Sequence, residues 1–185
     1  MKILYCEGPF QATSTSAPLV TLLTDSSLSR NNWPLFLPPH HQEWIMSFAP
    51  AFRVSRLGKF IATRFAQRYY DAMSIIARLR PASQQLPDSA VNTAFDSSAV
   101  VGAWIPLPGI EEFELRLSVN GVDSSHNLQL SSVNDTVSTL SRYFMIKHGD
   151  IITDGDLPLD ATNIKPGMSI DVSLNEKKCL NFKIK

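Results

Sequence analysis

The chain has 185 residues, which is the size of one ordinary domain, and its 44% apolar content is close to that of a globular protein. Lysine plus arginine equals aspartate plus glutamate at 17 each, so the formal net charge is zero. A neutral chain has no long-range field to attract nucleic acid or an anionic membrane. No apolar stretch approaches the roughly 18 residues of a membrane span. We therefore expect one domain without a nucleic-acid or membrane partner.

Two features bear on the compartment of the protein. The amino-terminal segment MKILYC contains an apolar run that is too short for the core of a secretory signal, which needs about 7 to 15 residues. Cys6 and Cys179 are the only two cysteines, and they form neither a disulfide framework nor metal-ligand spacing. We therefore expect reduced thiols and a cytoplasmic protein.

The first helical pattern in the chain is FIATRFAQRYY, residues 60–70, in which apolar residues recur every four positions opposite a basic face. This pattern predicts an amphipathic surface helix. Its apolar stripe consists of Ile61, Phe65 and Tyr69. Residues 69–80 follow as a buried strand that ends in two arginines. Residues 81–94 are rich in Pro, Ser, Gln and Asp without a period, which predicts a surface loop.

The carboxyl half is dominated by strand patterns. Residues 113–119 alternate apolar and polar side chains, which predicts a half-buried strand, and Asn120-Gly121 favours the positive φ angles of a type I′ hairpin turn. Residues 170–174 and 180–184 predict a second hairpin with a turn near Asn175.

A second helix is predicted over residues 134–149. Asn134 or Asp135 can cap its first exposed amides, and Gly149 suits a left-handed stop. Its buried stripe consists of Val137, Leu140 and Phe144. Strand patterns nonetheless outnumber helical ones, so the sequence favours a mainly β, α+β fold.

Four segments, taken in order, resemble the fumarylacetoacetate hydrolase family: SRLGKFIATRFAQRYYDA, AFDSSAVVGAWIPL, LRLSVNG and LSRYFMIKHGDII. The resemblance covers about residues 18–185. It implies that family's fold, a mixed β-sandwich roll with a few short helices that usually forms homodimers. We therefore interpret residues 1–185 as a single such domain, with residues 1–17 as a divergent, shortened amino-terminal segment.

The resemblance also implies a chemistry that can be checked residue by residue. Family members act on small β-dicarbonyl or 2-oxo acids as hydrolases, decarboxylases or isomerases, with Mg²⁺ or Ca²⁺ held by carboxylates. The paired glutamates of the family fall on Gln42 and Trp44, or on Glu43 and Ile45 if the register shifts by one. The third carboxylate falls on Arg78. An arginine there opposes a divalent cation, so we expect no metal cofactor.

The remaining family positions are altered as well. The family's two lysines fall on Leu23 and Thr93, and its substrate-contacting loop falls on Asp154, Gly155 and Asp156. The mobile segment with the family's catalytic histidine and glutamate has no match in CEGPFQATSTSAP. This pattern predicts an inactive family member, kept as a homodimer or as the partner subunit of an active paralogue.

Two alternatives remain open. The emptied pocket can bind a small anionic metabolite, with Arg78 and Arg80 as anion contacts and Trp44 as an apolar wall. The chain can instead be a divergent, metal-independent hydrolase or lyase. A third hypothesis concerns structure alone, since Arg78 and Arg80 can form a salt bridge with Asp154 or Asp156 across the old cavity.

Other candidate metal ligands are weaker. His40, His41 and Glu43 are ligand types, but neighbouring side chains in a strand point to opposite faces, so the two histidines are not expected to chelate together. Four aspartates lie close together in the sequence but lack the residue order of a calcium loop, so they predict a solvated acidic turn. These aspartates are Asp150, Asp154, Asp156 and Asp160. His126 and His148 are expected in a loop and at a helix end, where His148 favours the helix carboxyl terminus.

Overall fold

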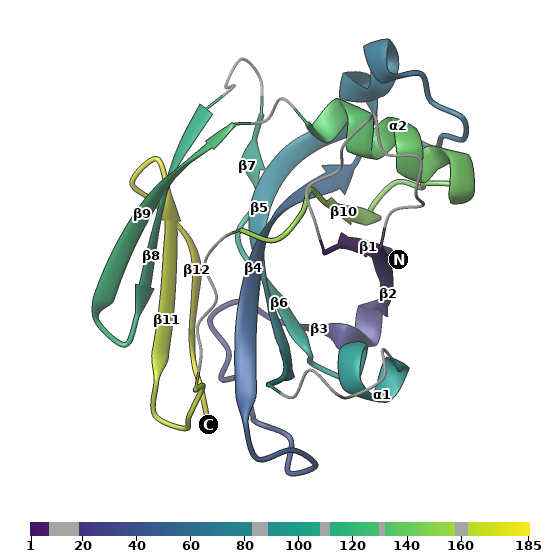
Figure 1. Ribbon diagram of the computed structural model, residues 1–185. Helices are drawn as coiled ribbons and strands as arrows, with labels where there is room; N and C mark the ends of the chain where they lie inside the picture. The colour runs from purple at the N-terminus through teal and green to yellow at the C-terminus, as the bar shows by residue number, and fades with distance from the viewer. Residues whose placement is uncertain (8–18, 83–88, 108–111, 130–131, 158–162) are drawn as a thin grey trace.

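The computed structural model describes residues 1–7, 19–82, 89–107, 112–129, 132–157 and 163–185 (Figure 1). Over these residues the chain forms an eight-stranded mixed sheet and a four-stranded antiparallel sheet, with few and short helices. The predicted mainly β fold is therefore confirmed. None of the helices described is long and apolar enough to cross a membrane.

The larger sheet has the strand order β2-β1-β10-β4-β5-β6-β3, with β7 paired to β5. Figure 1 shows that it curls, with the long strands β4 and β5 in the middle. Its strands are β1 (Lys2–Cys6), β2 (Val20–Thr24), β3 (Leu28–Ser29), β4 (Trp44–Val54), β5 (Tyr70–Pro81), β6 (Ala99–Val101), β7 (Ile105–Pro106) and β10 (Ile151–Thr153). The short 3-10 helix η1 (Asp25–Ser27) joins β2 to β3. The predicted strand at 69–80 corresponds to β5.

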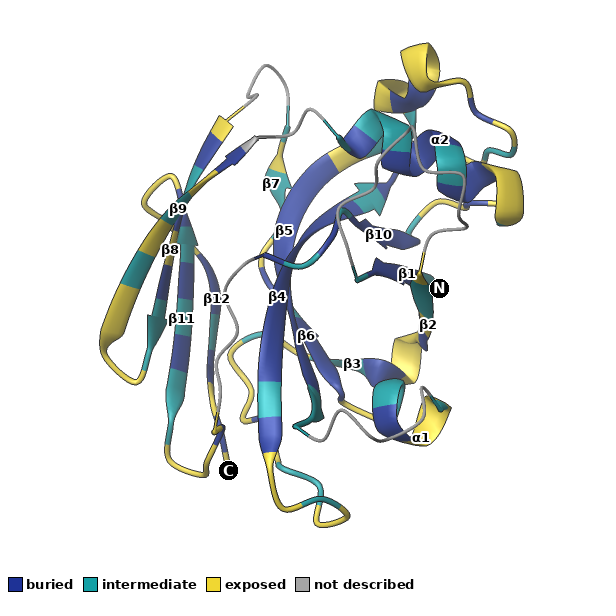
Figure 2. Cartoon of the chain, in the orientation of Figure 1, coloured by how far each residue is buried: buried dark blue, intermediate teal, exposed yellow. Residues whose placement is uncertain are grey.

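The two faces of the larger sheet carry different side chains. One face belongs to a large core cluster that also contains the inner residues of the smaller sheet and the buried face of a helix. The opposite face belongs to a second cluster built from this sheet alone. That second cluster consists of Ile3, Tyr5, Leu23, Ala49, Ala51, Ile76, Ala99 and Ile151. Both faces of β4 and β5 are consequently buried over most of their length (Figure 2).

The smaller sheet has the order β12-β11-β8-β9 and confirms both predicted hairpins. Its strands are β8 (Glu112–Val119), β9 (Val122–Gln129), β11 (Ser169–Leu174) and β12 (Lys177–Lys183). At the first turn Asn120 and Gly121 have φ angles of 51° and 81°, the positive pair that a type I′ turn requires. At the second turn Asn175 and Glu176 also have positive φ.

The helix predicted over residues 60–70 is wrong in type and in extent. The segment forms a 3-10 helix, η2 (Thr63–Tyr69), and Ile61 precedes it. A 3-10 helix has about three residues per turn, so residues four apart do not share one face. Accordingly Ile61 is 5% exposed, whereas Phe65 is 39% exposed.

The second predicted helix is confirmed in existence but not in its ends. It is α2 (Val133–Tyr143), with Ser132 at the N-cap in place of Asn134 or Asp135. Its carboxyl end comes six residues before Gly149, because Ile146 and Gly58 exchange backbone hydrogen bonds and draw the chain into a bridge. Val137 and Leu140 are buried as predicted, and Phe144 is half-buried beyond the helix.

The loop predicted over residues 81–94 is only partly irregular. Pro81 ends β5, and a single helical turn, α1 (Ala90–Thr93), lies within the predicted loop. Residues 83–88 lie outside the described part of the chain. Of the predicted divergent segment 1–17, residues 2–6 form β1, which lies between β2 and β10 in the larger sheet.

Candidate functional site

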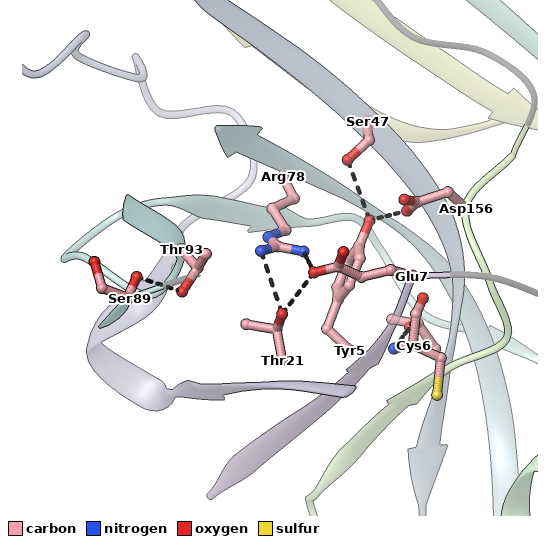
Figure 3. A network of polar contacts seen from close by, with 10 residues as sticks. Tyr5, Cys6, Glu7, Thr21, Ser47, Arg78, Ser89, Thr93 and Asp156 are labelled. Carbon is pink, nitrogen blue, oxygen red and sulfur yellow. Dashed lines mark hydrogen bonds and ion pairs between the residues drawn. The ribbon is translucent and has the colours of Figure 1, made fainter. Parts of the chain in front are cut away.

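The candidate site is centred on a buried arginine. Arg78 on β5 is paired with Ser47 on β4, and its side chain is 2% exposed. Its Nη1 donates a hydrogen bond to Glu7 Oε1 at 2.8 Å, and its Nη2 lies 3.4 Å from Thr21 Oγ1. The guanidinium carbon lies 4.7 Å from the centroid of the Tyr5 ring (Figure 3). An ion pair, a hydroxyl contact and a cation–π contact therefore hold one cation.

The hairpin of β1 and β2 supplies three of these partners. Tyr5 is paired with Thr21 in the antiparallel register, so both side chains lie on the same face of the sheet. Glu7 lies two residues after Tyr5 and points to the same side, and Thr21 Oγ1 donates a hydrogen bond of 2.6 Å to Glu7 Oε1. Leu23 lies farther along this face and is fully buried.

The loop after β10 brings a second carboxylate to the site. The Tyr5 hydroxyl donates a hydrogen bond to Asp156 Oδ1 and lies 3.4 Å from Ser47 Oγ (Figure 3). Gly155 has a φ of 84°, which turns the chain just before Asp156. The Leu157 amide then donates a hydrogen bond of 2.7 Å to the Phe48 carbonyl, which fixes the loop against β4.

Burial and charge shift the pKa values of these groups in different directions. Burial raises the pKa of Asp156 to about 6, although the Tyr5 hydrogen bond and the Arg78 charge both lower it. Burial also acts to raise the pKa of Glu7, but hydrogen bonds from Thr21 and Arg78 outweigh it and hold this pKa below its usual value. Burial, and then the charge of Asp156, raise the pKa of Tyr5. Glu7 is ionised at neutral pH and is bonded directly to Arg78, so its charge neutralises that of the guanidinium.

The structure does not bring the predicted metal-ligand positions together. Arg78 faces the same side as Ser47, and Trp44 lies three residues before Ser47 in an unbroken register, so Trp44 points to the opposite face. Trp44 packs against His40, His41 and Phe95, and the prediction that it walls the Arg78 pocket is wrong.

The residues on either side of Trp44 are placed differently. Gln42 precedes β4 and lines a separate cavity of about 430 Å³. The other lining residues of that cavity are His41, Glu43, Pro81 and Ala82. In the alternative register, Ile45 does share the face of Arg78, since it lies two residues before Ser47.

The side chains around Arg78 do not fit a divalent cation. Mg²⁺ and Ca²⁺ need several oxygen ligands, of which carboxylates are the most effective. Here one carboxylate, Glu7, is bound to the guanidinium itself, and the other, Asp156, accepts a hydrogen bond from Tyr5. Across the described ranges no group of three or more His, Cys, Asp or Glu residues is arranged to hold a metal.

The predicted salt bridge from Arg78 to Asp154 or Asp156 is wrong, because the ion pair of Arg78 is formed with Glu7. Asp154 instead accepts hydrogen bonds from the hydroxyls of Ser132 and Thr136 at the start of α2. Asp150 forms an ion pair with Lys2. These aspartates have separate partners and Asp150 is buried, so the predicted solvated acidic turn is wrong for the described residues. Asp160 lies outside them.

The histidines also differ from the prediction. His40 and His41 lie in the turn region before β4 and not in a strand, so strand alternation does not separate them. Their ring centroids are 4.8 Å apart, and His41 Nε2 lies 3.1 Å from Asn92 Oδ1. His126 lies in β9 and not in a loop, and His148 lies in the turn after α2.

Thr93 lies in α1, which packs on β5, and its hydroxyl donates a hydrogen bond of 2.8 Å to the Ser89 carbonyl. No sequence pattern singles out Tyr5, Glu7, Thr21 or Ser47 as members of this site. One signal was available, because a buried arginine requires a carboxylate. The sequence pattern did not show which carboxylate it would be.

The described residues thus form a curled β-roll with few and short helices. The family model described as fumarylacetoacetate (FAA) hydrolase C-terminal matches residues 69–185, more than half of the chain. The chain therefore belongs to the fumarylacetoacetate hydrolase family, as the resemblance of its motifs predicted. A comparison with curated proteins found no match.

Solved structures agree with this fold. The fumarylpyruvate hydrolase of Pseudomonas aeruginosa, solved in complex with Mn²⁺ and pyruvate, has a TM-score of 0.86 at 16% identity, over 100% of this chain and 89% of that one. A putative fumarylacetoacetate hydrolase family protein of Yersinia pestis CO92 has a TM-score of 0.85 at 18% identity. The match covers 100% of this chain and 92% of that one. The 5-carboxymethyl-2-hydroxymuconate delta-isomerase of Mycobacterium smegmatis has a TM-score of 0.84 at 19% identity. The match covers 99% of this chain and 76% of that one. At such low identity these likenesses show the fold alone.

Proposed function

We propose that this chain is a non-catalytic member of the fumarylacetoacetate hydrolase family, kept as a homodimer or as the partner subunit of an active paralogue. The observation that carries the proposal is the buried Arg78, held by Glu7 at the position where the resemblance places a metal-binding carboxylate. We also propose that it is cytoplasmic, in agreement with two cysteines that are both unpaired and buried.

Electrostatics support the loss of metal chemistry. A unit positive charge at about 4 Å opposes another by about 1 kcal/mol even in water, and by several times more where water is excluded. Arg78 is 2% exposed, so solvent screens it little. A divalent cation entering here would meet the guanidinium and would also have to compete with it for Glu7.

The loop that contacts substrate in the family serves a structural purpose here. Asp154 holds the first turn of α2 through two hydroxyls, and Asp156 is engaged by Tyr5. Both carboxylates are thus occupied by the fold itself. This arrangement supports a protein that retains the scaffold and not the reaction.

A turnover assay tests the proposal. Purified protein would be incubated with an acylpyruvate and with oxaloacetate, in the presence of Mg²⁺ or Mn²⁺ and again in the presence of a chelator. We expect no hydrolysis or decarboxylation above the uncatalysed rate. Turnover by the wild type that persists with the chelator, and that the Arg78→Gln variant lacks, would overturn the proposal. It would favour a metal-independent hydrolase or lyase.

The proposed assembly has its own test. Light scattering of the purified chain is expected to give twice the mass of the 20.6 kDa monomer. A monomer that becomes a stable heterodimer on co-expression with an active paralogue would favour the partner-subunit form. A monomer under both conditions would contradict the proposed role as a subunit.

A further inference from the structure

We propose that Arg78 is the centre of a binding site for a small carboxylate ligand, and that Glu7 is an internal carboxylate which occupies the site until a ligand displaces it. The inference rests on the proposed function, because it requires that no metal takes the place of the guanidinium. It assigns a ligand class to this face of the sheet and a gating role to one residue.

The first observation is that the guanidinium is incompletely satisfied. Arg78 Nε is buried and has no hydrogen-bond partner in the described structure, although nearly all buried polar groups have one. The contact with Glu7 joins Nη1 to Oε1. A planar guanidinium binds a carboxylate best through two parallel hydrogen bonds. A donor that Glu7 leaves unused is therefore available to a carboxylate that enters at a different angle.

The second observation concerns the groups around this donor. The Tyr5 ring lies against the guanidinium, and the hydroxyls of Thr21 and Ser47 lie on the same face of the sheet. Figure 3 shows these side chains converging from β1, β2, β4 and β5. Hydroxyl groups beside a buried cation suit the oxygens of a small polar anion.

The third observation is the position of Glu7. Its side chain is 26% exposed, compared with 2% for Arg78, so the glutamate approaches the arginine from the solvent side. It follows the last residue of β1, and its amide donates a backbone hydrogen bond of 3.3 Å to the Leu19 carbonyl. Glu7 can therefore move without any change in the β4–β5 pair.

Charge balance favours the replacement of Glu7 by a ligand carboxylate over the departure of Glu7 alone. A buried arginine without a counter-ion is strongly destabilising, so loss of Glu7 alone is disfavoured. A ligand carboxylate carries the same charge as Glu7 and replaces it without leaving the guanidinium unpaired. The site would accordingly select small carboxylates over neutral molecules of the same shape.

The test compares malonate with malonamide, its neutral analogue, by isothermal titration calorimetry at pH 7.5 and constant ionic strength with EDTA present. The wild type is expected to bind malonate weakly. Glu7→Gln keeps the shape of the side chain but removes its charge, and is expected to bind malonate about tenfold more tightly or better. Malonamide is expected to bind neither protein.

A matched control is provided by Glu114→Gln, which breaks the exposed ion pair between Arg116 and Glu114 on the smaller sheet. It is expected to leave malonate affinity unchanged. Adding Arg78→Gln to Glu7→Gln is expected to abolish binding. If Glu7→Gln does not fold, Glu7→Asp keeps the charge on a shorter side chain and is expected to show a smaller gain in affinity.

Two outcomes would overturn the inference. They are equal malonate affinity in the wild type and the Glu7 variant, and binding that survives the loss of Arg78. Malonate binding that appears only when Mg²⁺ replaces EDTA would instead contradict the proposed function. The two failures are therefore distinguishable in one set of titrations.

Discussion

Arg78 and Glu7 are 71 residues apart in the sequence, and their ion pair of 2.8 Å joins the central strand β5 to the end of β1. The arginine is 2% exposed and the glutamate 26%. Removing a charged side chain from water is costly, and a buried pair is stable only while both partners remain. The contact therefore makes part of the stability of the fold depend on one carboxylate.

A double-mutant cycle should reveal this dependence. Glu7→Gln leaves a buried cation without its partner, so we expect it to lower the free energy of unfolding by roughly 2 to 4 kcal/mol. Arg78→Met removes the charge but leaves Glu7 able to reach solvent, so its cost should be smaller. Urea unfolding of both single variants and the double variant would give the coupling energy, which we expect to be about 1.5 kcal/mol or more. Strictly additive effects would argue against a stabilising pair.

The pKa of Asp156 predicts a specific pH dependence. Burial raises it to about 6 from the usual 3.8, so the folded state favours the protonated carboxyl. Its contribution to stability is then fully present below pH 3.8 and is lost as the pH rises through about 6. Asp156→Asn should therefore match the wild type at pH 4 and exceed it by roughly 1 kcal/mol at pH 7.5.

The comparison isolates Asp156 from the other carboxylates. Glu7 and Asp150 have lowered pKa values in the folded state. The wild type and Asp156→Asn therefore both lose stability as the pH falls toward those values. The difference between the two unfolding curves removes that shared loss. A variant that is less stable than the wild type at pH 7.5 would contradict the burial argument.

Asp154 should prove important for stability. The hydroxyls of Ser132 and Thr136 donate hydrogen bonds to it, and Thr136 is fully buried. Asp154→Ala leaves that buried hydroxyl unpaired and removes a negative charge near the start of α2. We therefore expect a loss of about 2 to 3 kcal/mol in thermal unfolding. The exposed control Asp123→Ala should change stability by less than about 0.5 kcal/mol.

Gly102 marks a close contact between the two sheets. A Cβ atom added there would lie 2.6 Å from the Cys179 carbonyl oxygen and 2.7 Å from its Sγ. Gly102→Ala should therefore cost about 1 to 3 kcal/mol through overpacking. Adding Cys179→Ala removes the sulfur but not the carbonyl, so it should not restore wild-type stability. Full recovery in the double variant would show that the backbone approach is less restrictive than we infer.

The sequence predicted elements whose signals are local. The hairpin at Asn120-Gly121 and the one near Asn175 follow from alternating strands and from residues that tolerate positive φ. The strand that carries Arg78 follows from its apolar run. The end of α2 was misplaced because the bridge between Gly58 and Ile146, which no local pattern reveals, draws the chain out of the helix.

The site was less predictable, because its contacts also join residues that are far apart in the sequence. Arg78 was singled out from the resemblance, yet its counter-ion was assigned to the loop at 154–156. The curl of the larger sheet (Figure 1) decides the matter, because it brings Tyr5 on β1 and Thr21 on β2 to Arg78 on β5. Trp44 was misplaced because its face depends on the register of β4 against β5, which one sequence does not fix.

The most direct test of the central claim is metal binding, measured by elemental analysis of the purified protein and by thermal unfolding with added Mg²⁺, Ca²⁺ and Mn²⁺. The wild type should contain far less than one ion per chain, and none of the ions should raise its unfolding temperature. Arg78→Asp places a third carboxylate beside Glu7 and Asp156 and should gain metal-dependent stability, whereas Arg78→Asn should not. Near-stoichiometric metal that stabilises the wild type would contradict the account and restore the family's metal chemistry to this chain.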